Sequence, residues 1–266
     1  MLRDVTLKTI YDQRRGLLAW CVSLALLVAM YVAVWPSIRG QPSMAQFLDS
    51  MPKAFRALFA MSGADMSSPA GYVQIELLSF LGPMILLGYA IAAGSSAVAG
   101  EEERHTLDML LANPVSRARV VLEKGAAMVV GVLLLAAVTA AALLFEGPLG
   151  DLRLPAGNVV AAMVHLALLA LVFGSLALAL GASTGRLGLS RAVPAVAAVA
   201  AYVVNGLGPL VSWLEPLQKF SPFYQYGGHD PLRTGVSTSG ILVAVLTVLA
   251  FAGLAVAGFR RRDIAA

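Results

Sequence analysis

The chain has 266 residues, of which 59% are hydrophobic and 13% are charged, and its formal net charge is +4. Soluble domains carry about 25% charged residues. With a mean hydropathy of +0.80, the composition therefore argues against a soluble fold and indicates a membrane protein. We interpret the excess of Lys and Arg as a topology signal rather than as affinity for nucleic acid.

Six apolar runs are long enough to cross a hydrocarbon core of about 30 Å as helices. Backbone polar groups in lipid must bond within the chain, and the alternating short segments of a β-barrel are absent from the sequence. We therefore predict an all-α polytopic membrane protein with six transmembrane helices. The predicted spans are 16–35, 77–99, 125–145, 158–181, 192–214 and 236–259.

The N-terminal segment 1–15 has apolar side chains near one helical face and charged side chains on the others. This pattern predicts an interfacial helix on the inner leaflet, with a frayed basic tail as the alternative. The run 16–35 is longer than a signal-peptide core of 7–15 residues, so we predict an uncleaved span. Its Cys21 is the sole cysteine, which excludes an internal disulfide. We divide the chain into the interfacial helix 1–15 and a six-helix transmembrane domain, 16–266.

Basic residues are distributed unequally between the predicted loops. Thirteen Lys and Arg lie in the two terminal segments and in 100–124 and 182–191, whereas the other loops hold six. The positive-inside rule then places both termini and the 100–124 loop in the cytoplasm. High Ala content and 15 Arg against 4 Lys favour a bacterial source. We expect a multi-pass protein of the bacterial inner membrane.

The outer loop 36–76 holds apolar side chains at helical spacing within 43–62, which predicts short amphipathic helices. After this stretch, Ser68 is placed to cap the next helix with Pro69 at its first position.

Several spans contain helix breakers, which are candidate hinges or lining groups of a translocation path, although Gly and Pro are also common in membrane helices. The cluster in 205–209 is the strongest candidate for a true break. The candidate residues are Gly82, Pro83, Pro194, Asn205, Gly206, Gly208 and Pro209.

The segment 100–124 is the only long charged stretch between two membrane-length apolar runs. Acidic residues 101–103 suit a helix N-terminus, and Leu107, Leu110 and Leu111 follow at helical spacing. Pro114 should end this helix, and Ser116 should cap the next. The pattern fits two interpretations: a loop helix packed on its own headgroup region, or a helix that docks in a groove of another protein.

The core TLDMLLANPVSR resembles the loop between spans two and three of ABC-2-type permeases, the membrane subunits of ATP-binding-cassette exporters. The family pattern is approximately E-E-x-x-G-T-L-x-x-L-L-x-x-P-V-S-R, often ending in Lys, and this chain has His105 in place of the usual Gly. Weaker resemblances occur at 67–72 and 221–235, so the similarity covers essentially the whole chain.

The resemblance implies a type V exporter-like membrane domain whose 100–124 loop contains a coupling helix seated in a cleft of the ATPase subunit. Glu102 and Glu103 would face basic groups of that partner, the leucines would make apolar contacts, and Pro114 with Arg117 would set the turn back to the membrane. The ATPase-coupling residues would be Glu101, Glu102, Glu103, Thr106, Leu107, Leu110, Leu111, Pro114 and Arg117.

No G-x-x-x-x-G-K-[ST] motif occurs in the chain, and the nearest string, GASTGRLG, lacks the Lys. We therefore expect no catalytic residues, no metal and no cofactor in this chain. ATP and Mg²⁺ would bind a separate ABC ATPase, present in two copies.

His165 is the only ionisable residue deep within a predicted span, which makes it a candidate for a substrate or proton role. The alternative is a neutral His bonded to a neighbouring helix. The other histidines, His105 and His229, lie at separate places in the sequence. An intramembrane protease is disfavoured because Ser175 in span four has no His in span six to meet.

We predict the permease subunit of an ABC exporter that moves a hydrophobic or amphipathic substrate, such as a drug, lipid or peptide. It would act as a homodimer or heterodimer of permeases in the lipid bilayer, with a cavity at the two-fold axis and no nucleic-acid partner. The alternative is an ion-coupled secondary transporter, which the lack of a mid-span acidic residue disfavours.

Overall fold

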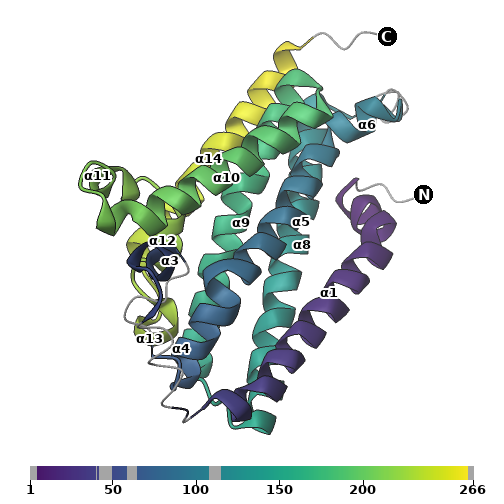
Figure 1. The fold of residues 1–266 in the computed structure, drawn as a ribbon. Coiled ribbons are helices and arrows are strands. Elements are labelled where there is room, and N and C mark those ends of the chain that lie inside the picture. The colour runs from purple at the N-terminus through teal and green to yellow at the C-terminus, as the bar shows by residue number, and fades with distance from the viewer. Residues whose placement is uncertain (1–4, 40, 42–49, 59–64, 108–114, 263–266) are drawn as a thin grey trace.

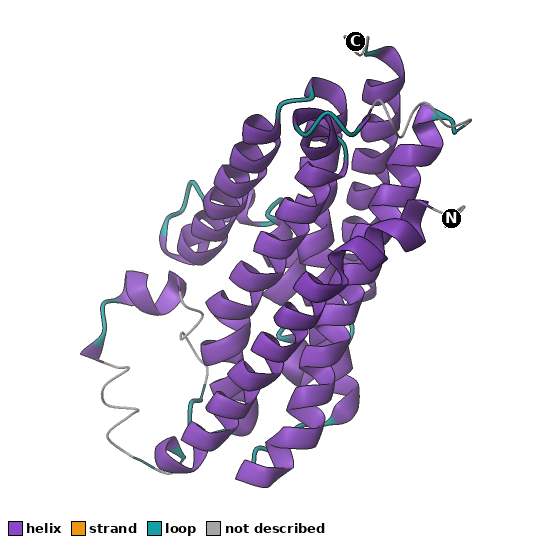
Figure 2. Cartoon of the chain, turned by 90° about the vertical axis from the view of Figure 1, so that its right-hand side faces the viewer, coloured by secondary structure: helices purple, strands orange, loops and turns teal. Residues whose placement is uncertain are grey.

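The computed structural model describes residues 5–39, 41, 50–58, 65–107 and 115–262. Within these ranges every regular element is a helix and no strand occurs (Figure 1, Figure 2). The all-α prediction is therefore confirmed.

Among the described residues, six helical segments are long and apolar enough to cross a membrane, which confirms the prediction of six spans. The second, third and fifth crossings each combine more than one element. In chain order the crossings are α1 (Val5–Ile38); α4 (Pro69–Val73), η1 (Gln74–Leu81) and α5 (Gly82–Ala97); α8 (Arg117–Glu146) and η2 (Gly147–Gly150); α9 (Ala156–Thr184); α10 (Leu187–Leu207) and η3 (Gly208–Leu210); and α14 (Thr238–Arg261). The shorter helices are α3 (Lys53–Leu58), α6 (Ala99–Glu103), α11 (Glu215–Gln218), α12 (Pro222–Gly227) and α13 (Pro231–Thr234).

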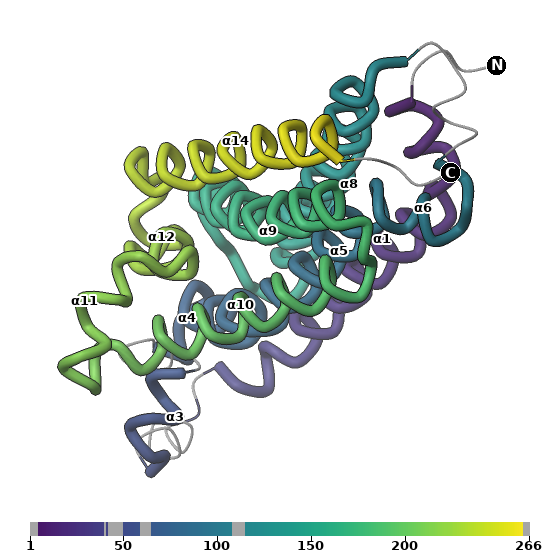
Figure 3. The backbone as a smooth tube through the Cα atoms, turned by 90° about the horizontal axis from the view of Figure 1, so that it is seen from above, coloured from purple at the N-terminus to yellow at the C-terminus, as the bar shows by residue number. Residues whose placement is uncertain are grey.

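Helix α9 forms the centre of the bundle. It packs against α5, α8, α10 and α14, and in the view from above it lies between α14 and α10 (Figure 3). Small residues bring its backbone close to α5, since a Cβ added to Gly94 would lie 2.2 Å from the carbonyl oxygen of Gly174. By contrast, α1, α10 and α14 leave most of their apolar side chains exposed, as expected of helices that face lipid or another subunit.

Both ends of the described chain lie at the same end of the bundle. The start of α1, the short helix α6 and the last turn of α14 gather there, and we call this the terminal end (Figure 1). Helices α3, α12 and α13 lie toward the opposite end. An even number of crossings requires this arrangement, and the terminal end carries the loop singled out by the sequence.

The N-terminal segment does not form a separate helix. Residues 5–15 continue without a break into the first crossing as one helix of 34 residues, Val5–Ile38. The predicted boundary at residue 16 is therefore not a structural break. The placement of 1–15 in the interface stays a prediction.

A π-helix precedes the Gly82-Pro83 pair in the second crossing. The N–H of Gly82 bonds to the carbonyl oxygen of Leu77, five residues earlier, and so η1 widens the helix just before Pro83. A Cβ on Gly82 would lie 2.7 Å from that oxygen. The element η1 also contains Glu76, which lies within the crossing Pro69–Ala97 and not at its outer edge as the predicted span implied.

The other predicted breakers behave differently from one another. Pro194 is buried inside α10, which continues through it. The cluster 205–209 does end the helix: α10 stops at Leu207 and gives way to the 3-10 turn η3, which contains Pro209. The side-chain amide of Gln218 donates a hydrogen bond to the carbonyl oxygen of Asn205 at 3.0 Å. Gly206 and Gly208 face Leu58 and Gln218 so closely that an added Cβ would lie 3.0 Å and 2.9 Å from them.

Two predicted helix caps are confirmed. The hydroxyl of Ser68 accepts from the N–H of Gly71 at 3.2 Å with Pro69 in the first turn, and the hydroxyl of Ser116 accepts from the N–H of Arg119 at 3.3 Å. The described part of the outer loop contains α3, whereas 42–49 and 59–64 lie outside the described residues.

Candidate functional site

The loop singled out by the sequence begins with a break between α5 and α6 at Val98. Helix α6 spans only Ala99–Glu103, and a turn at Arg104 and His105 follows it. The helix predicted to begin with residues 101–103 and to end before Pro114 is therefore not continuous, because the chain leaves the helical conformation at Arg104 and returns to it only at Leu107. Leu110, Leu111 and Pro114 lie outside the described residues.

His105 explains why the helix stops there. Its φ is +53°, in the left-handed region that an L-residue with a side chain enters at a cost of about 1–2 kcal/mol. Glycine enters this region without that cost, and glycine is the residue that the family pattern has at this position. The departure from the family pattern therefore falls on a backbone position of the turn that favours glycine.

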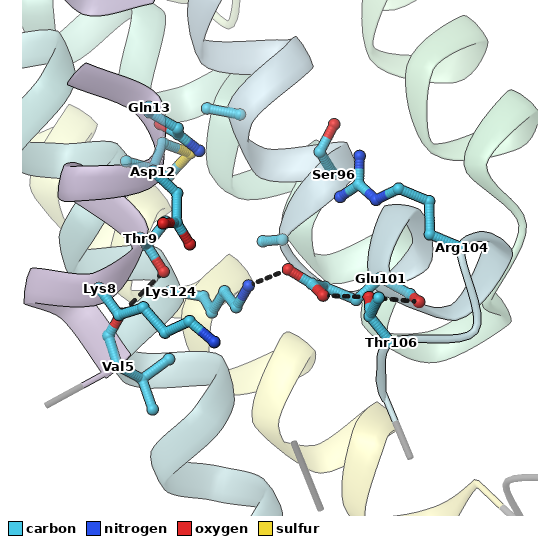
Figure 4. Close-up of a pocket in the computed structure, with 13 residues that line it drawn as sticks. Val5, Lys8, Thr9, Asp12, Gln13, Ser96, Glu101, Arg104, Thr106 and Lys124 are labelled. Carbon is cyan, nitrogen blue, oxygen red and sulfur yellow. Dashed lines mark hydrogen bonds and ion pairs between the residues drawn. The ribbon is translucent and has the colours of Figure 1, made fainter. Parts of the chain in front are cut away.

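Glu101 is held by the chain itself. Its carboxylate accepts from the ammonium of Lys124 in α8 and from the hydroxyl of Thr106 (Figure 4). The N–H of Thr106 also donates to the carbonyl oxygen of Glu101 at 2.9 Å. Burial raises the pKa of Glu101. The hydrogen bonds from Lys124 and Thr106 and the charge of Lys124 together lower it by more, so the pKa lies below its ordinary value of 4.5. The ion pair of Glu101 with Lys124 thus fastens α6 to α8, and Thr106 holds the turn after α6 to the same carboxylate.

Glu102 is held by the C-terminal end of the chain. It forms an ion pair with Arg262, just after α14. Arg262 also donates to the carbonyl oxygen of Ala182 at 3.5 Å, near the end of α9. Arg117, at the start of α8, donates to the carbonyl oxygen of Arg262 at 2.6 Å. Glu102, Arg262 and Arg117 therefore join α6, α8, α9 and α14 in one polar cluster.

Gly185 makes room for this cluster. It ends α9 with a φ of +67°, and a Cβ there would lie 2.6 Å from the Oε2 atom of Glu102 and 2.2 Å from the Nη2 atom of Arg262. Its conformation and the close approach of the ion pair both favour glycine. No local sequence pattern connects Gly185 with the 100–124 loop.

Glu103 and Leu107 differ sharply in exposure. Glu103 is exposed and lines an open groove of about 540 Å³ with Glu102 and residues 185–189. Leu107 is only 1% exposed, and it packs in a cluster with apolar residues that include Val98, Leu178 and Phe259. Its predicted contact with a partner is not possible in this conformation, because its side chain is buried in this chain.

His165 lies away from this loop, near the start of α14. It is 2% exposed, and its Nε2 atom accepts a hydrogen bond from the N–H of Ser237 at 3.1 Å. Its ring packs against His229 with the ring centroids 4.5 Å apart, although the two histidines are separated by 64 positions in the sequence. The geometry favours a neutral histidine that connects α9 to the start of α14. No group of three metal-ligating side chains occurs among the described residues.

Comparison with known proteins agrees with this arrangement. The protein-family profile described as "ABC-2 family transporter protein" matches residues 4–264, which is nearly the whole chain. No curated protein matches the chain. The match covers the crossings, the acidic loop and the C-terminal residues that bind it. The chain therefore belongs to the ABC-2 transporter family, whose members are membrane subunits of ABC transporters.

Proposed function

We propose that this chain is the permease of an ATP-driven exporter, and that a separate ATPase drives it through the loop between α5 and α8. Two copies of the ATPase would bind ATP and Mg²⁺ beneath two copies of the permease, identical or homologous. The substrate would be hydrophobic or amphipathic, such as a drug, lipid or peptide. Family membership together with the placement of this loop at the terminal end supports the proposal.

The distribution of charge supports a cytoplasmic terminal end. The described residues of the segments that meet there hold 12 of the 19 Lys and Arg of the sequence. By the positive-inside rule this end faces the cytoplasm, where an ATPase and its ATP are available. We therefore place both termini and the loop in the cytoplasm of a bacterial cell, with the protein in its inner membrane.

The contacts of α6 are the single observation that carries the mechanism. Glu101 is bound to α8 through Lys124, and Glu102 is bound to the end of α14 through Arg262. A displacement of the loop would be passed to two crossings by ion pairs rather than absorbed by a loose connection. In this mechanism Glu101 and Glu102 are positioning residues.

Glu103 then remains as the acidic residue that reaches the partner. It is exposed, and its side chain forms no ion pair or hydrogen bond with any part of the chain that the structure describes. We propose that Glu103 faces a basic group of the ATPase. The sequence-based role of Glu102 at that surface is replaced by its role within the chain.

The test is co-purification of the ATPase with variants of the full-length permease. Glu103→Lys should lower the amount of bound ATPase, because it reverses a charge at the contact. Glu215→Lys makes the same change at an exposed acidic residue of α11, away from the terminal end, and should leave binding unchanged. The double change Leu110→Asp and Leu111→Asp should abolish binding while the protein still inserts in the membrane. If the ATPase co-purifies equally with all these variants, the proposed coupling surface is wrong.

A further inference from the structure

A polar cavity of about 640 Å³ lies at the terminal end, between the first turns of α1 and the α5–α6 corner. Lys8, Asp12 and Gln13 line it from α1, and Arg104 and Ser96 line it from the opposite side (Figure 4). Ala93, Ala97 and Met128 supply an apolar part of the lining. The cavity therefore combines a charged region with an apolar region, as a site for an amphipathic molecule requires.

Basic side chains outnumber acidic side chains in the lining of the cavity, with Lys8, Arg104 and Lys124 against Asp12 and Glu101. Lys124 is neutralised by Glu101. The side chains of Lys8 and Arg104 form no ion pair or hydrogen bond with the residues that the structure describes, although the charge of Arg104 also acts on Glu101. Figure 4 shows their charged groups reaching into the space from opposite walls. Asp12 is the one acidic side chain of the lining that is not held by Lys124. An anion between Lys8 and Arg104 would satisfy both cations, and a phosphate oxygen suits both an ammonium and a guanidinium.

The length of α1 places this cavity at the level of lipid headgroups. A helix of 34 residues is about 51 Å long at 1.5 Å per residue, and the hydrocarbon core is about 30 Å thick. The first turns of α1, which carry Lys8 and Asp12, therefore extend beyond the hydrocarbon. The exposed side chains of Leu7 and Tyr11 on the same turns suit the boundary between lipid and water.

We propose that this cavity binds the headgroup of an anionic glycerophospholipid, with its phosphate between Lys8 and Arg104. Asp12 and Gln13 would bond to headgroup hydroxyls, as phosphatidylglycerol provides, and the apolar lining near Met128 would contact the start of an acyl chain. The bound lipid would bridge α1 and the turn after α6, and so stiffen the base of the loop. Binding itself does not depend on the proposed function, whereas any effect on coupling does.

The experiment measures retention of phosphatidylglycerol by the purified full-length protein, using native mass spectrometry with phosphatidylcholine as the competing lipid. The wild type should prefer phosphatidylglycerol. Lys8→Gln with Arg104→Gln should weaken its apparent affinity at least about tenfold, because two charges at the membrane surface are removed. Lys53→Gln with Arg153→Gln removes two exposed cations elsewhere and should leave the affinity unchanged.

Two further measurements separate loss of charge from loss of fold, and a lipid headgroup from a soluble phosphate. Lys8→Arg with Arg104→Lys preserves the charge and should retain binding, which separates loss of charge from loss of fold. Soluble glycerol 3-phosphate at millimolar concentration should not displace the lipid, and full displacement would instead assign the site to a soluble phosphate ester. Equal retention of phosphatidylglycerol by the wild type and the Lys8→Gln, Arg104→Gln variant would overturn the proposal. None of these outcomes depends on an ATPase, so they leave the proposed function to its own test.

Discussion

The ion pair between Glu101 and Lys124 offers the sharpest test of how the loop is held. The side chain of Lys124 is 8% exposed and that of Glu101 is 22% exposed. Removing one partner of a buried pair costs about 3–5 kcal/mol, because the other charge is left uncompensated. Since this pair keeps some contact with solvent, we expect Glu101→Gln to cost about 3 kcal/mol in free energy of unfolding.

Removing the other partner, Lys124, should lower the free energy of unfolding by less. In Lys124→Met the carboxylate of Glu101 keeps its hydrogen bond from Thr106, and it is more exposed to solvent than Lys124 is. We therefore expect a loss of about 1–2 kcal/mol in free energy of unfolding. The double variant leaves no unpaired charge and should lose no more than Lys124→Met alone. The coupling energy of the double-mutant cycle should then be at least about 3 kcal/mol.

Thermal unfolding in detergent measures this cycle. About 3 kcal/mol corresponds to a fall in Tm of roughly 6–12 °C for a chain of this size. Glu215→Gln is the matched control, because it removes an exposed carboxylate and should change the stability by less than about 0.5 kcal/mol. Additive losses, with a coupling energy near zero, would refute the conclusion that this pair fastens α6 to α8.

Three further predictions concern the same loop. The pKa of Glu101 is lowered in the folded state, so its ionised carboxylate stabilises the fold at pH values above the unfolded pKa near 4.5. This stabilisation should be lost as the pH falls through the lower pKa of the folded state. Glu101→Gln should therefore flatten the acidic part of a plot of Tm against pH. His105→Gly should raise the free energy of unfolding by about 1 kcal/mol by relieving the left-handed conformation, and a lower Tm would contradict the assignment of that turn. Gly185→Ala should lower the free energy of unfolding by about 1–3 kcal/mol and weaken the ion pair of Glu102. Gly157→Ala is the control, because an added Cβ there meets nothing within 4 Å, and it should be nearly neutral in the same unfolding assay.

The elements that the sequence predicted well are those fixed by local physics. The six crossings follow from the length and polarity of apolar runs, which any membrane helix must satisfy. The caps at Ser68 and Ser116 follow from side chains within three residues of the donors they satisfy. The stop at Leu207 follows from a cluster of Gly and Pro nearby. None of these depends on which helix packs against which.

The features that the sequence did not predict depend on contacts between distant residues. Glu101 meets Lys124 across 23 positions, and Glu102 meets Arg262 across 160. His165 and His229 meet because α9 and the segment before α14 pack together. A local pattern carries no information about such pairs. The Lys that often ends the family pattern was the one available hint, because it supplies a cation near the acidic residues of the same loop.

The three glutamates of the acidic cluster differ in exposure, and this difference separates their proposed roles. The resemblance to the family implies a coupling role for all three, with Glu102 and Glu103 facing basic groups of a partner. In the structure Glu101 and Glu102 are bound within the chain, and Glu103 alone is exposed. In the mechanism we propose, the acidic cluster therefore has two separable tasks: two carboxylates fix the loop to α8 and α14, and the third is left for recognition by the ATPase. A loop recognised by a partner but not fixed to α8 and α14 would bend under load, so transmission of force requires both tasks.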